Sequence, residues 1–362
     1  MSVIDVTAAA YTIPTDTPEA DGTLAWDSTP CSSCTRAPRR VGVGWTYAPA
    51  AVSRSSTTCS PDRRRASVED VPGVHEAMVR ALRNAGRPGI AGCALSAVDV
   101  ALWDLKARLL SLPLHRLLGA LRDRVPVYGS GGFTTYDDDR LDAQLCHWVH
   151  EQDIPRVKIK IAESWGTATT RDLHRIRRAR EVIGDAAELF VDANGGYTAK
   201  QAVRIMDAAA DCDVHWLEEP VSSDDLDGLR RVREAVRAEV TAGEYGYDLP
   251  YFHRMCAAGA VDCLQADITR CGGITEWLRV AAVAAAHGLD LSAHCAPHLH
   301  VHAAATIAHL RHLEWFHDHV RIETRFFDGA LDPAGGSVQP RDDSPGHGLT
   351  PKLPDLDRFR VR

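Results

Sequence analysis

The stretch "ELFVDANGGYTAKQAVRIMDAAADCDVHWLEEP", residues 188–220, decides the fold because it reads as a strand, a helix and a second strand. Two short apolar runs flank a segment whose apolar residues recur at helical spacing. The first run closes on Asp192 and the second on Glu218, 26 residues later. That separation is typical of one repeating unit of a parallel barrel.

The same alternation extends in both directions from about residue 125. Further strand-like runs lie at 125–131, 157–161, 239–244, 262–267, 289–294 and 310–316. Eight runs with helical segments between them predict an α/β fold, a (β/α)₈ barrel over 125–325. Residues 1–124 predict an α+β capping domain. Residues 326–362, rich in Pro, Gly and Asp, predict a tail that packs back on that cap.

Successive strand runs close on polar residues, which a barrel brings to one rim, the carboxyl ends of its strands. These residues are Asp192, Glu218, Glu244, Asp267 and His294. In "VKIKIA", residues 157–162, Lys158 and Lys160 lie two apart, so both ammonium groups share one face. A dry core would destabilise paired lysines, and we expect them to face this rim.

Three carboxylates on neighbouring strands, Asp192, Glu218 and Glu244, would repel one another without a cation among them. An all-oxygen set favours Mg²⁺, although each carboxylate taken singly is also compatible with a rim salt bridge. Mg²⁺ beside a substrate carboxylate acidifies its α-proton. Lys160, next to Lys158 and the metal, is then a base with a lowered pKa, and His294 oriented by Asp267 is a second proton-transfer group.

The motifs "KIK", "VDANGGY", "WLEEP", "AGE", "QADITRCGGITEW" and "SAH", in this order, resemble the enolase superfamily, mandelate racemase subgroup, over nearly the whole chain. The resemblance implies Mg²⁺ as cofactor and the following site residues. Asp192, Glu218 and Glu244 would be metal ligands; Lys160 the base with Lys158 as its partner; His294 and Asp267 the opposite dyad; and Asn194 and Arg270 secondary substrate contacts.

Three details of that resemblance are open. Arg270 stands where the racemase has a lysine. A glutamate near the eighth strand that contacts the substrate carboxylate is Glu323 by motif alignment or Glu314 by strand position, and we rank Glu323 first. The cap loop "TDTPEADGTLAWDS" would close over the rim, with Asp21 and Trp26 as lid contacts suited to a hydroxylated acid.

Other motifs have simpler interpretations. His298, His300 and His302 suggest zinc but read better as part of the last barrel helix. "GSGG" at 129–132 is weak evidence for phosphate binding and equally suits tight packing. The Cys31/Cys34 pair lacks a second half, and the arginines in "PDRRRASVED", 61–70, read as a solvated face.

The composition excludes some classes of protein. The chain has 362 residues and a formal charge of −8, which argues against a nucleic-acid surface. It has neither an apolar run long enough to cross a bilayer nor a signal-like start, so we expect a cytoplasmic protein without a membrane partner. The expected partner is a small-molecule carboxylate, and the resemblance implies a homo-oligomer.

The cap sequence is unusual between residues 28 and 68. Neither "PCSSCTRAPRR" nor "VSRSSTTCSPDRRR" has a pattern that buries one face, so two cap elements lack their expected signal. We hypothesise a local frameshift in the coding DNA; genuine divergence with a rearranged cap edge is the alternative. Resequencing the DNA over this segment tests the two.

The residues and the resemblance together predict a lyase of the hydro-lyase type, an acid-sugar dehydratase that makes a 2-keto-3-deoxy acid with His294 as the acid. Racemisation or epimerisation of a 2-hydroxy acid is the runner-up, because two bases facing one carbon permit it. A catalytically impaired relative that only binds its ligand is the third possibility.

Overall fold

The predicted barrel is confirmed. In the computed structural model, which describes residues 5–37, 41–58, 68–333 and 335–361, eight parallel strands form one sheet that closes on itself where β11 pairs with β4. The strands are β4 Val125–Gly131, β5 Arg156–Lys160, β6 Glu188–Asp192, β7 Val214–Glu218, β8 Glu239–Ala242, β9 Cys263–Ala266, β10 Asp290–Ala293 and β11 Leu310–Phe316. Each pairs with its sequence neighbour, as repeated right-handed units require.

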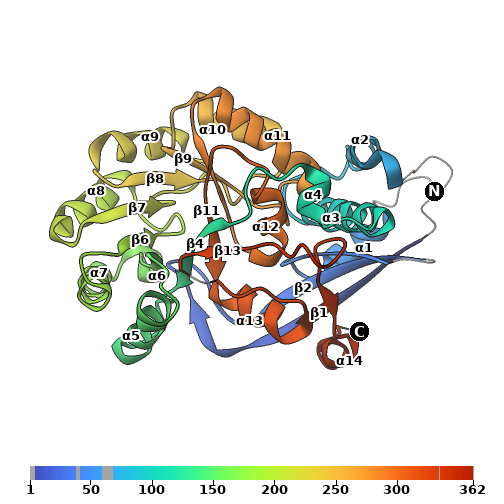
Figure 1. Cartoon of the computed structure of the whole chain (residues 1–362). Helices are drawn as coiled ribbons and strands as arrows, with labels where there is room; N and C mark the ends of the chain where they lie inside the picture. The colour runs from blue at the N-terminus through green and yellow to red at the C-terminus, as the bar shows by residue number, and fades with distance from the viewer. Residues whose placement is uncertain (1–4, 38–40, 59–67, 334, 362) are drawn as a thin grey trace.

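Helices surround the barrel on its outer side (Figure 1). They are α5 Asp138–Cys146, α6 Glu163–Gly166, α7 Thr169–Ile183, α8 Ala199–Ala208, α9 Leu226–Ala235, α10 Leu249–Ala257, α11 Gly273–Ala286, α12 Pro297–Ala304 and α13 His317–Phe326. The side chains of Asp137, Thr198, Asp225 and Asp248 each accept a hydrogen bond from a backbone amide in the first turn of α5, α8, α9 or α10. Such N-caps fix where each helix begins.

The lower part of the barrel interior is filled by large side chains. Tyr128, Phe190, Trp216 and Cys263 form one buried cluster, and the ring of His312 contacts the three aromatic residues. This packed interior confines any ligand to the opposite end, where the strands finish.

The cap combines a three-stranded antiparallel sheet with four helices. Its elements are β1 Asp5–Ala20, β2 Ala25–Ala37, β3 Gly42–Thr46, α1 Ala51–Thr58, α2 Val71–Ala81, α3 Ile90–Leu110 and α4 Leu114–Leu118. The long helix α3 lies directly on β3. A Cβ added at Gly44 would meet the Ala97 carbonyl oxygen at 2.3 Å, so only glycine permits this approach.

The strand β2 differs from the expectation that "PCSSCTRAPRR" cannot bury a face. Ala25–Ala37 pairs with β1 on one side and β3 on the other, and Cys31 and Ser32 are buried. Small side chains fill the narrow space there, which a search for large apolar residues misses. The first half of "VSRSSTTCSPDRRR", residues 52–58, lies in α1, where Val52 is buried, and the second half, residues 59–65, lies outside the described residues. The frameshift hypothesis stays a prediction.

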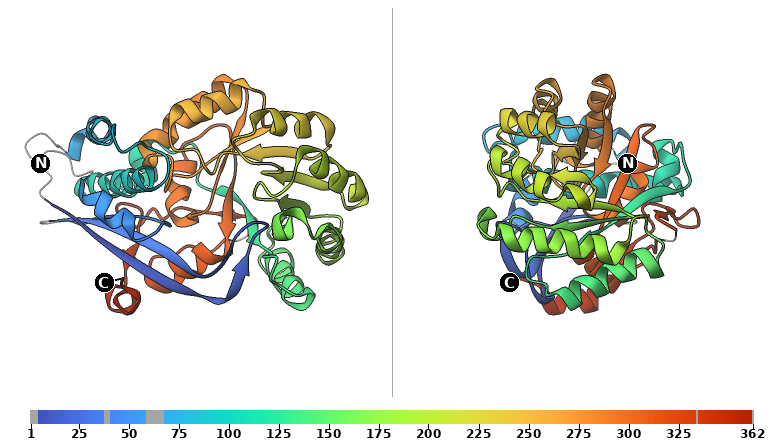
Figure 2. Two further views of the ribbon diagram at one scale, coloured as in Figure 1. Left: turned by 180° about the vertical axis from the view of Figure 1, so that it is seen from behind. Right: turned by 90° about the vertical axis from the view of Figure 1, so that its left-hand side faces the viewer.

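The tip of the β1–β2 hairpin reaches the barrel rim, which the long blue hairpin in Figures 1 and 2 makes visible. The Thr134 amide donates to the Ala20 carbonyl at 2.8 Å, and the Trp165 amide donates to the Gly22 carbonyl at 2.8 Å. These bonds attach the cap to the loops that follow β4 and β5. The hairpin therefore covers the end of the barrel at which the strands finish.

The last residues of the chain return to the cap. This segment contains β12 Phe327–Asp328, β13 Ser337–Val338, β14 Thr350–Pro351 and α14 Leu353–Leu356. The amide of Val361 donates to the Ala10 carbonyl at 2.8 Å, and His347 Nε2 donates to the Val43 carbonyl at 2.9 Å. Among the described residues, no helix combines the length and the apolar character needed to cross a bilayer.

Candidate active site

Three buried carboxylates meet at the barrel rim. Asp192 ends β6, Glu218 ends β7, and Glu244 follows β8 by two residues. One oxygen of each lies within 4.8 Å of those of the other two. Burial raises the pKa of Glu218 to about 7, with Asp192 and Glu314 adding to the rise while Lys158 opposes it. The strands thus concentrate negative charge at one buried point.

The lysines of β5 face this charge. Lys160 Nζ lies 2.5 Å from Asp192 Oδ2, and Lys158 Nζ lies 2.6 Å from Glu218 Oε1 and 2.7 Å from Glu314 Oε1. The lowered Lys160 pKa that we expect beside Mg²⁺ stays a prediction. Among the protein's own groups, burial acts to lower the Lys160 pKa, but Asp192, with Glu218 and Glu314, outweighs burial and the pKa is raised.

His294 and Asp267 form a hydrogen-bonded pair on the neighbouring strands. His294 Nδ1 donates to Asp267 Oδ2 at 2.8 Å, while His294 Nε2 lies 3.1 Å from Glu244 Oε2. Burial disfavours the charged ring, yet Cys295 and the carboxylates of Glu244 and Glu314 raise the His294 pKa well above its usual value. The pair is thus oriented and biased toward imidazolium.

The position of Glu323 is a correction to our ranking. Its carboxylate lies on α13, where it accepts hydrogen bonds from Tyr47 Oη at 2.8 Å and His298 Nδ1 at 2.5 Å. Glu314 instead lies within β11, accepts from Ser130 Oγ at 2.7 Å, and contacts Lys158. Alternation along β11 turns Glu314 into the barrel, while a helical residue outside the barrel does not reach the rim.

A cavity of about 230 Å³ opens among these groups. The predicted residues that line it are Asp21, Trp26, Lys160, Asn194, Glu244, Arg270, His294 and Glu314. Trp26 Nε1 donates to Glu19 Oε2 at 3.0 Å, and Arg270 contacts Glu244 at 3.2 Å. The structure therefore brings together the two lid residues, both proton-transfer residues and both secondary residues.

Several residues of this site were not predicted from the sequence. Cys295 follows His294 directly and lines the cavity, and its adjacency to His294 was the available signal. Glu19 is fully buried in the lid, and burial together with Asp318 raises its pKa to about 8. Arg175 is buried on α7 and donates to the Lys160 carbonyl at 3.4 Å, which no local pattern indicates.

The other motifs occupy structural positions. The ring nitrogens of His298, His300 and His302 go to separate partners: Glu323, the Ile268 amide and the His347 carbonyl. A Cβ at Gly129 would meet Trp148 at 2.5 Å, which accounts for the glycine run as packing. The Cys34 side chain and most of the arginine cluster lie outside the described residues.

The donor set tests whether magnesium suits this rim. Asp192, Glu218 and Glu244 offer only carboxylate oxygens, the ligands that hard divalent cations prefer. All three are buried, where uncompensated carboxylates are costly. The ammonium groups of Lys158 and Lys160 neutralise part of the charge of these carboxylates. A bound divalent cation would take over that role. The residues fit Mg²⁺.

A buried carboxylate trio at the rim of a capped (β/α)₈ barrel defines a class of metal-assisted enzymes. Residues 140–356 match the family model "Enolase C-terminal domain-like", and residues 67–119 match "Mandelate racemase / muconate lactonizing enzyme, N-terminal domain". This chain belongs to the mandelate racemase/muconate lactonizing enzyme family of the enolase superfamily. The matched range 67–119 begins near the end of the unusual cap segment, so residues 28–66 lie before it.

Two curated relatives are similar in sequence. The 3,6-anhydro-alpha-L-galactonate cycloisomerase of Streptomyces coelicolor is 32% identical over 300 residues, which cover 82% of this chain and 80% of that protein. The L-talarate/galactarate dehydratase of Salmonella typhimurium is 32% identical over 268 residues, 72% of this chain and 66% of that protein. The chain thus matches just under two thirds of the dehydratase's length.

Two solved structures share the whole fold. A mandelate racemase/muconate lactonizing enzyme-like protein from Rubrobacter xylanophilus is 46% identical, with a TM-score of 0.95 over all of both chains. The Salmonella dehydratase, liganded with Mg and L-lyxarohydroxamate, is 26% identical in that comparison, with a TM-score of 0.88 over 99% of this chain and 92% of that one.

Proposed function

We propose that this chain is a Mg²⁺-dependent hydro-lyase that removes the α-proton of a sugar acid, expels the β-hydroxyl as water and releases a 2-keto-3-deoxy acid. The observation that carries the proposal is that Lys160 and His294 reach one cavity from different strands beside a carboxylate trio. The curated relatives include dehydratases of several sugar acids.

We assign Asp192, Glu218 and Glu244 as the residues that hold Mg²⁺. The bound ion would stabilise the negative charge that develops on the substrate carboxylate as the α-carbon loses its proton. Lys158 and Glu314, paired at 2.7 Å, would orient that carboxylate. The hairpin tip with Asp21 and Trp26 keeps bulk water from the cavity.

Two side chains move the protons. Lys160 takes the α-proton in its neutral form, so its contact with Asp192 has to open first. His294 gives a proton from Nε2 to the departing hydroxyl, and Asp267 holds the ring through Nδ1. Asn194 and Arg270, which line the same cavity, are proposed contacts for the substrate's hydroxyl groups.

The test is an incubation of the protein and Mg²⁺ with a panel of sugar acids, including galactarate, gluconate, galactonate and rhamnonate. We expect a 2-keto acid from at least one. Lys160→Ala should reduce its formation by about 10²- to 10⁴-fold. Lys200→Ala, at an exposed lysine of α8, is the matched control and should retain it.

A racemase or epimerase is the second candidate, because two proton-transfer groups on one cavity also permit inversion at the α-carbon. One curated relative is an epimerase. Exchange of the α-proton in D₂O without any keto acid would overturn dehydration in favour of this reaction. Binding of an acid with neither exchange nor keto acid would favour the binding-protein alternative.

Substrate identity within the sugar acids, a cytoplasmic location and homo-oligomerisation stay predictions. Sedimentation at several protein concentrations tests the last of these.

A further inference from the structure

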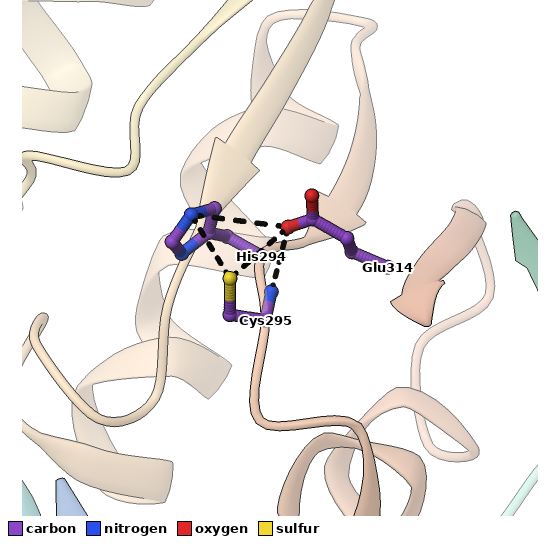
Figure 3. Close-up of side chains that lie close together, drawn as sticks. All are labelled: His294, Cys295 and Glu314. Atoms are coloured by element: carbon purple, nitrogen blue, oxygen red, sulfur yellow. Dashed lines mark hydrogen bonds and ion pairs between the residues drawn. The ribbon is translucent and has the colours of Figure 1, made fainter. Parts of the chain in front are cut away.

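The thiol of Cys295 lies between two groups of the site and has no part in the proposed chemistry. Figure 3 shows His294, Cys295 and Glu314 with their polar ends directed toward one another. Cys295 Sγ lies 3.3 Å from His294 Nε2 and 3.4 Å from Glu314 Oε2, and Nε2 lies 3.8 Å from Oε2. All three side chains are buried.

Each donor atom is oriented by a neighbour. Asp267 holds His294 Nδ1, which leaves Nε2 directed at the thiol, as in carboxylate–histidine–metal arrangements. Lys158 and Ser130 hold Glu314 Oε1, so that Oε2 faces Cys295. Cys295 itself has φ of +51°, a left-handed conformation that turns its side chain inward.

The spacing suits a tetrahedral metal site. With metal–nitrogen and metal–oxygen bonds of about 2.0 to 2.1 Å and a zinc–sulfur bond of about 2.3 Å, ligand atoms of such a site lie about 3.3 to 3.6 Å apart. The three observed separations fall in or near this range. A mixed nitrogen, sulfur and oxygen set selects a softer cation than the all-carboxylate set does.

We propose that His294, Cys295 and Glu314 form a second metal site, selective for thiophilic divalent cations of the Zn²⁺ class and distinct from the carboxylate trio. The fourth position faces the cavity of about 230 Å³, where water completes the coordination. A metal–sulfur bond forms as the thiol S–H bond breaks, and a metal–nitrogen bond forms as His294 gives up its Nε2 proton. Both protons pass to solvent without any change of oxidation state. Thiolate and Glu314 together balance the two positive charges.

Occupation of this site would engage His294 Nε2. If the proposed function holds, a thiophilic cation therefore inhibits the enzyme by removing its second proton-transfer group. Glu244 Oε2 lies 3.1 Å from the same nitrogen, so the two sites are neighbours. Binding measurements consequently need saturating Mg²⁺, which keeps the carboxylate trio filled.

The test is a titration of the full chain, in saturating Mg²⁺, with Co²⁺ and then Cd²⁺, followed by thiolate-to-metal charge-transfer absorption. We expect a band that saturates at one equivalent. Cys295→Ser should lose that equivalent and weaken Cd²⁺ binding about tenfold or more. Cys256→Ser, a buried thiol on outer helix α10, is the matched control and should keep the band.

X-ray absorption of the one-equivalent Zn²⁺ form gives a second readout, with one sulfur expected at about 2.3 Å. Circular dichroism shows whether each variant is folded, and Cys295→Ala replaces Cys295→Ser if the latter is not. A wild-type band no larger than that of the folded Cys295 variant overturns the site. Loss of the band in Cys256→Ser overturns its assignment to Cys295. Neither readout depends on catalytic activity.

Discussion

Lys160 illustrates how one contact changes the state of a side chain. Its ammonium group lies 2.5 Å from Asp192 Oδ2, and this carboxylate together with Glu218 and Glu314 raises the Lys160 pKa against the effect of burial. The spacing of "KIK" was sufficient to place the group at the rim. Its protonation depends on the distances to side chains that lie at least 32 positions away in the sequence, and a local sequence pattern does not contain these distances.

This pairing predicts a metal-dependent cost for Lys160→Ala. In the absence of Mg²⁺ the substitution leaves the buried Asp192 with only its longer contact to Lys158, at 3.5 Å, and we expect the free energy of unfolding to fall by up to about 3 kcal/mol. With Mg²⁺ present, the bound ion neutralises Asp192 and most of that loss should be recovered. Urea unfolding with and without Mg²⁺ measures both values, and an equal loss in the two conditions would contradict the assigned metal site.

At the scale of elements, the strands and helices of the barrel were predictable because their periodicities are regular. The choice between Glu314 and Glu323 was not, because it depends on whether "RIETRF", residues 321–326, continues a strand or lies in α13. Alignment of a short motif favoured Glu323, whereas inward alternation along β11 places Glu314 at the rim. The burial of β2 was missed for a different reason, because its buried positions hold small residues rather than large apolar ones.

Helix α7 supports the rim through Arg175. This buried guanidinium donates to the carbonyls of Gly132, Phe133, Tyr136 and Lys160, and burial lowers its pKa to about 10. The side chain thereby satisfies the backbone that follows β4 and the end of β5. Arg171 on the same helix also donates to the Thr134 and Tyr136 carbonyls, so two arginines join the loops beneath the hairpin tip to α7.

Arg175→Met should lower the free energy of unfolding by about 3 to 5 kcal/mol, because buried carbonyls lose their donors. Arg175→Lys should recover part of the loss. Arg177→Met, at an exposed arginine of the same helix, is the matched control and should cost less than about 1 kcal/mol. Chemical denaturation measures all three, and a loss for Arg175→Met no larger than the control's would show that the buried network contributes little.

At the scale of the whole molecule, the site is completed by parts of the chain that are distant in sequence. The barrel supplies its chemistry, and the first strands of the cap supply its cover. The order of motifs predicted this division, but not which backbone groups join the two parts. Those bonds, such as Trp165 to Gly22, involve amides and carbonyls that every residue carries.

Buried histidines throughout the molecule set its response to acid. The pKa is lowered, chiefly by burial, for His75, His300, His302, His312, His319 and His347, and for His75 it is about 4. These rings stay neutral in the folded chain, while the unfolded chain takes up protons near pH 6.5. Stability is therefore present above about pH 6.5 and is lost as the pH falls toward 4.

We expect the free energy of unfolding to fall by several kcal/mol between about pH 7 and pH 5. Four groups with raised pKa values oppose this trend: Glu19 at about 8, Asp99 and Glu218 at about 7, and His294. Urea titrations across these pH values give the slope, and His302→Asn should make it shallower. A flat profile for the wild type would show that the lowered values do not hold in solution.

The contact between Val361 and Ala10 has a consequence for the order in which the protein folds. The strand that covers the cavity precedes all eight barrel strands in the sequence, and the residues that bond to its edge follow them. The cover is therefore secured by contacts between residues that are far apart along the chain, and such contacts form slowly because a long loop has to close. A barrel built from neighbouring units can form first, and the pocket matures only when its cover is joined at both ends.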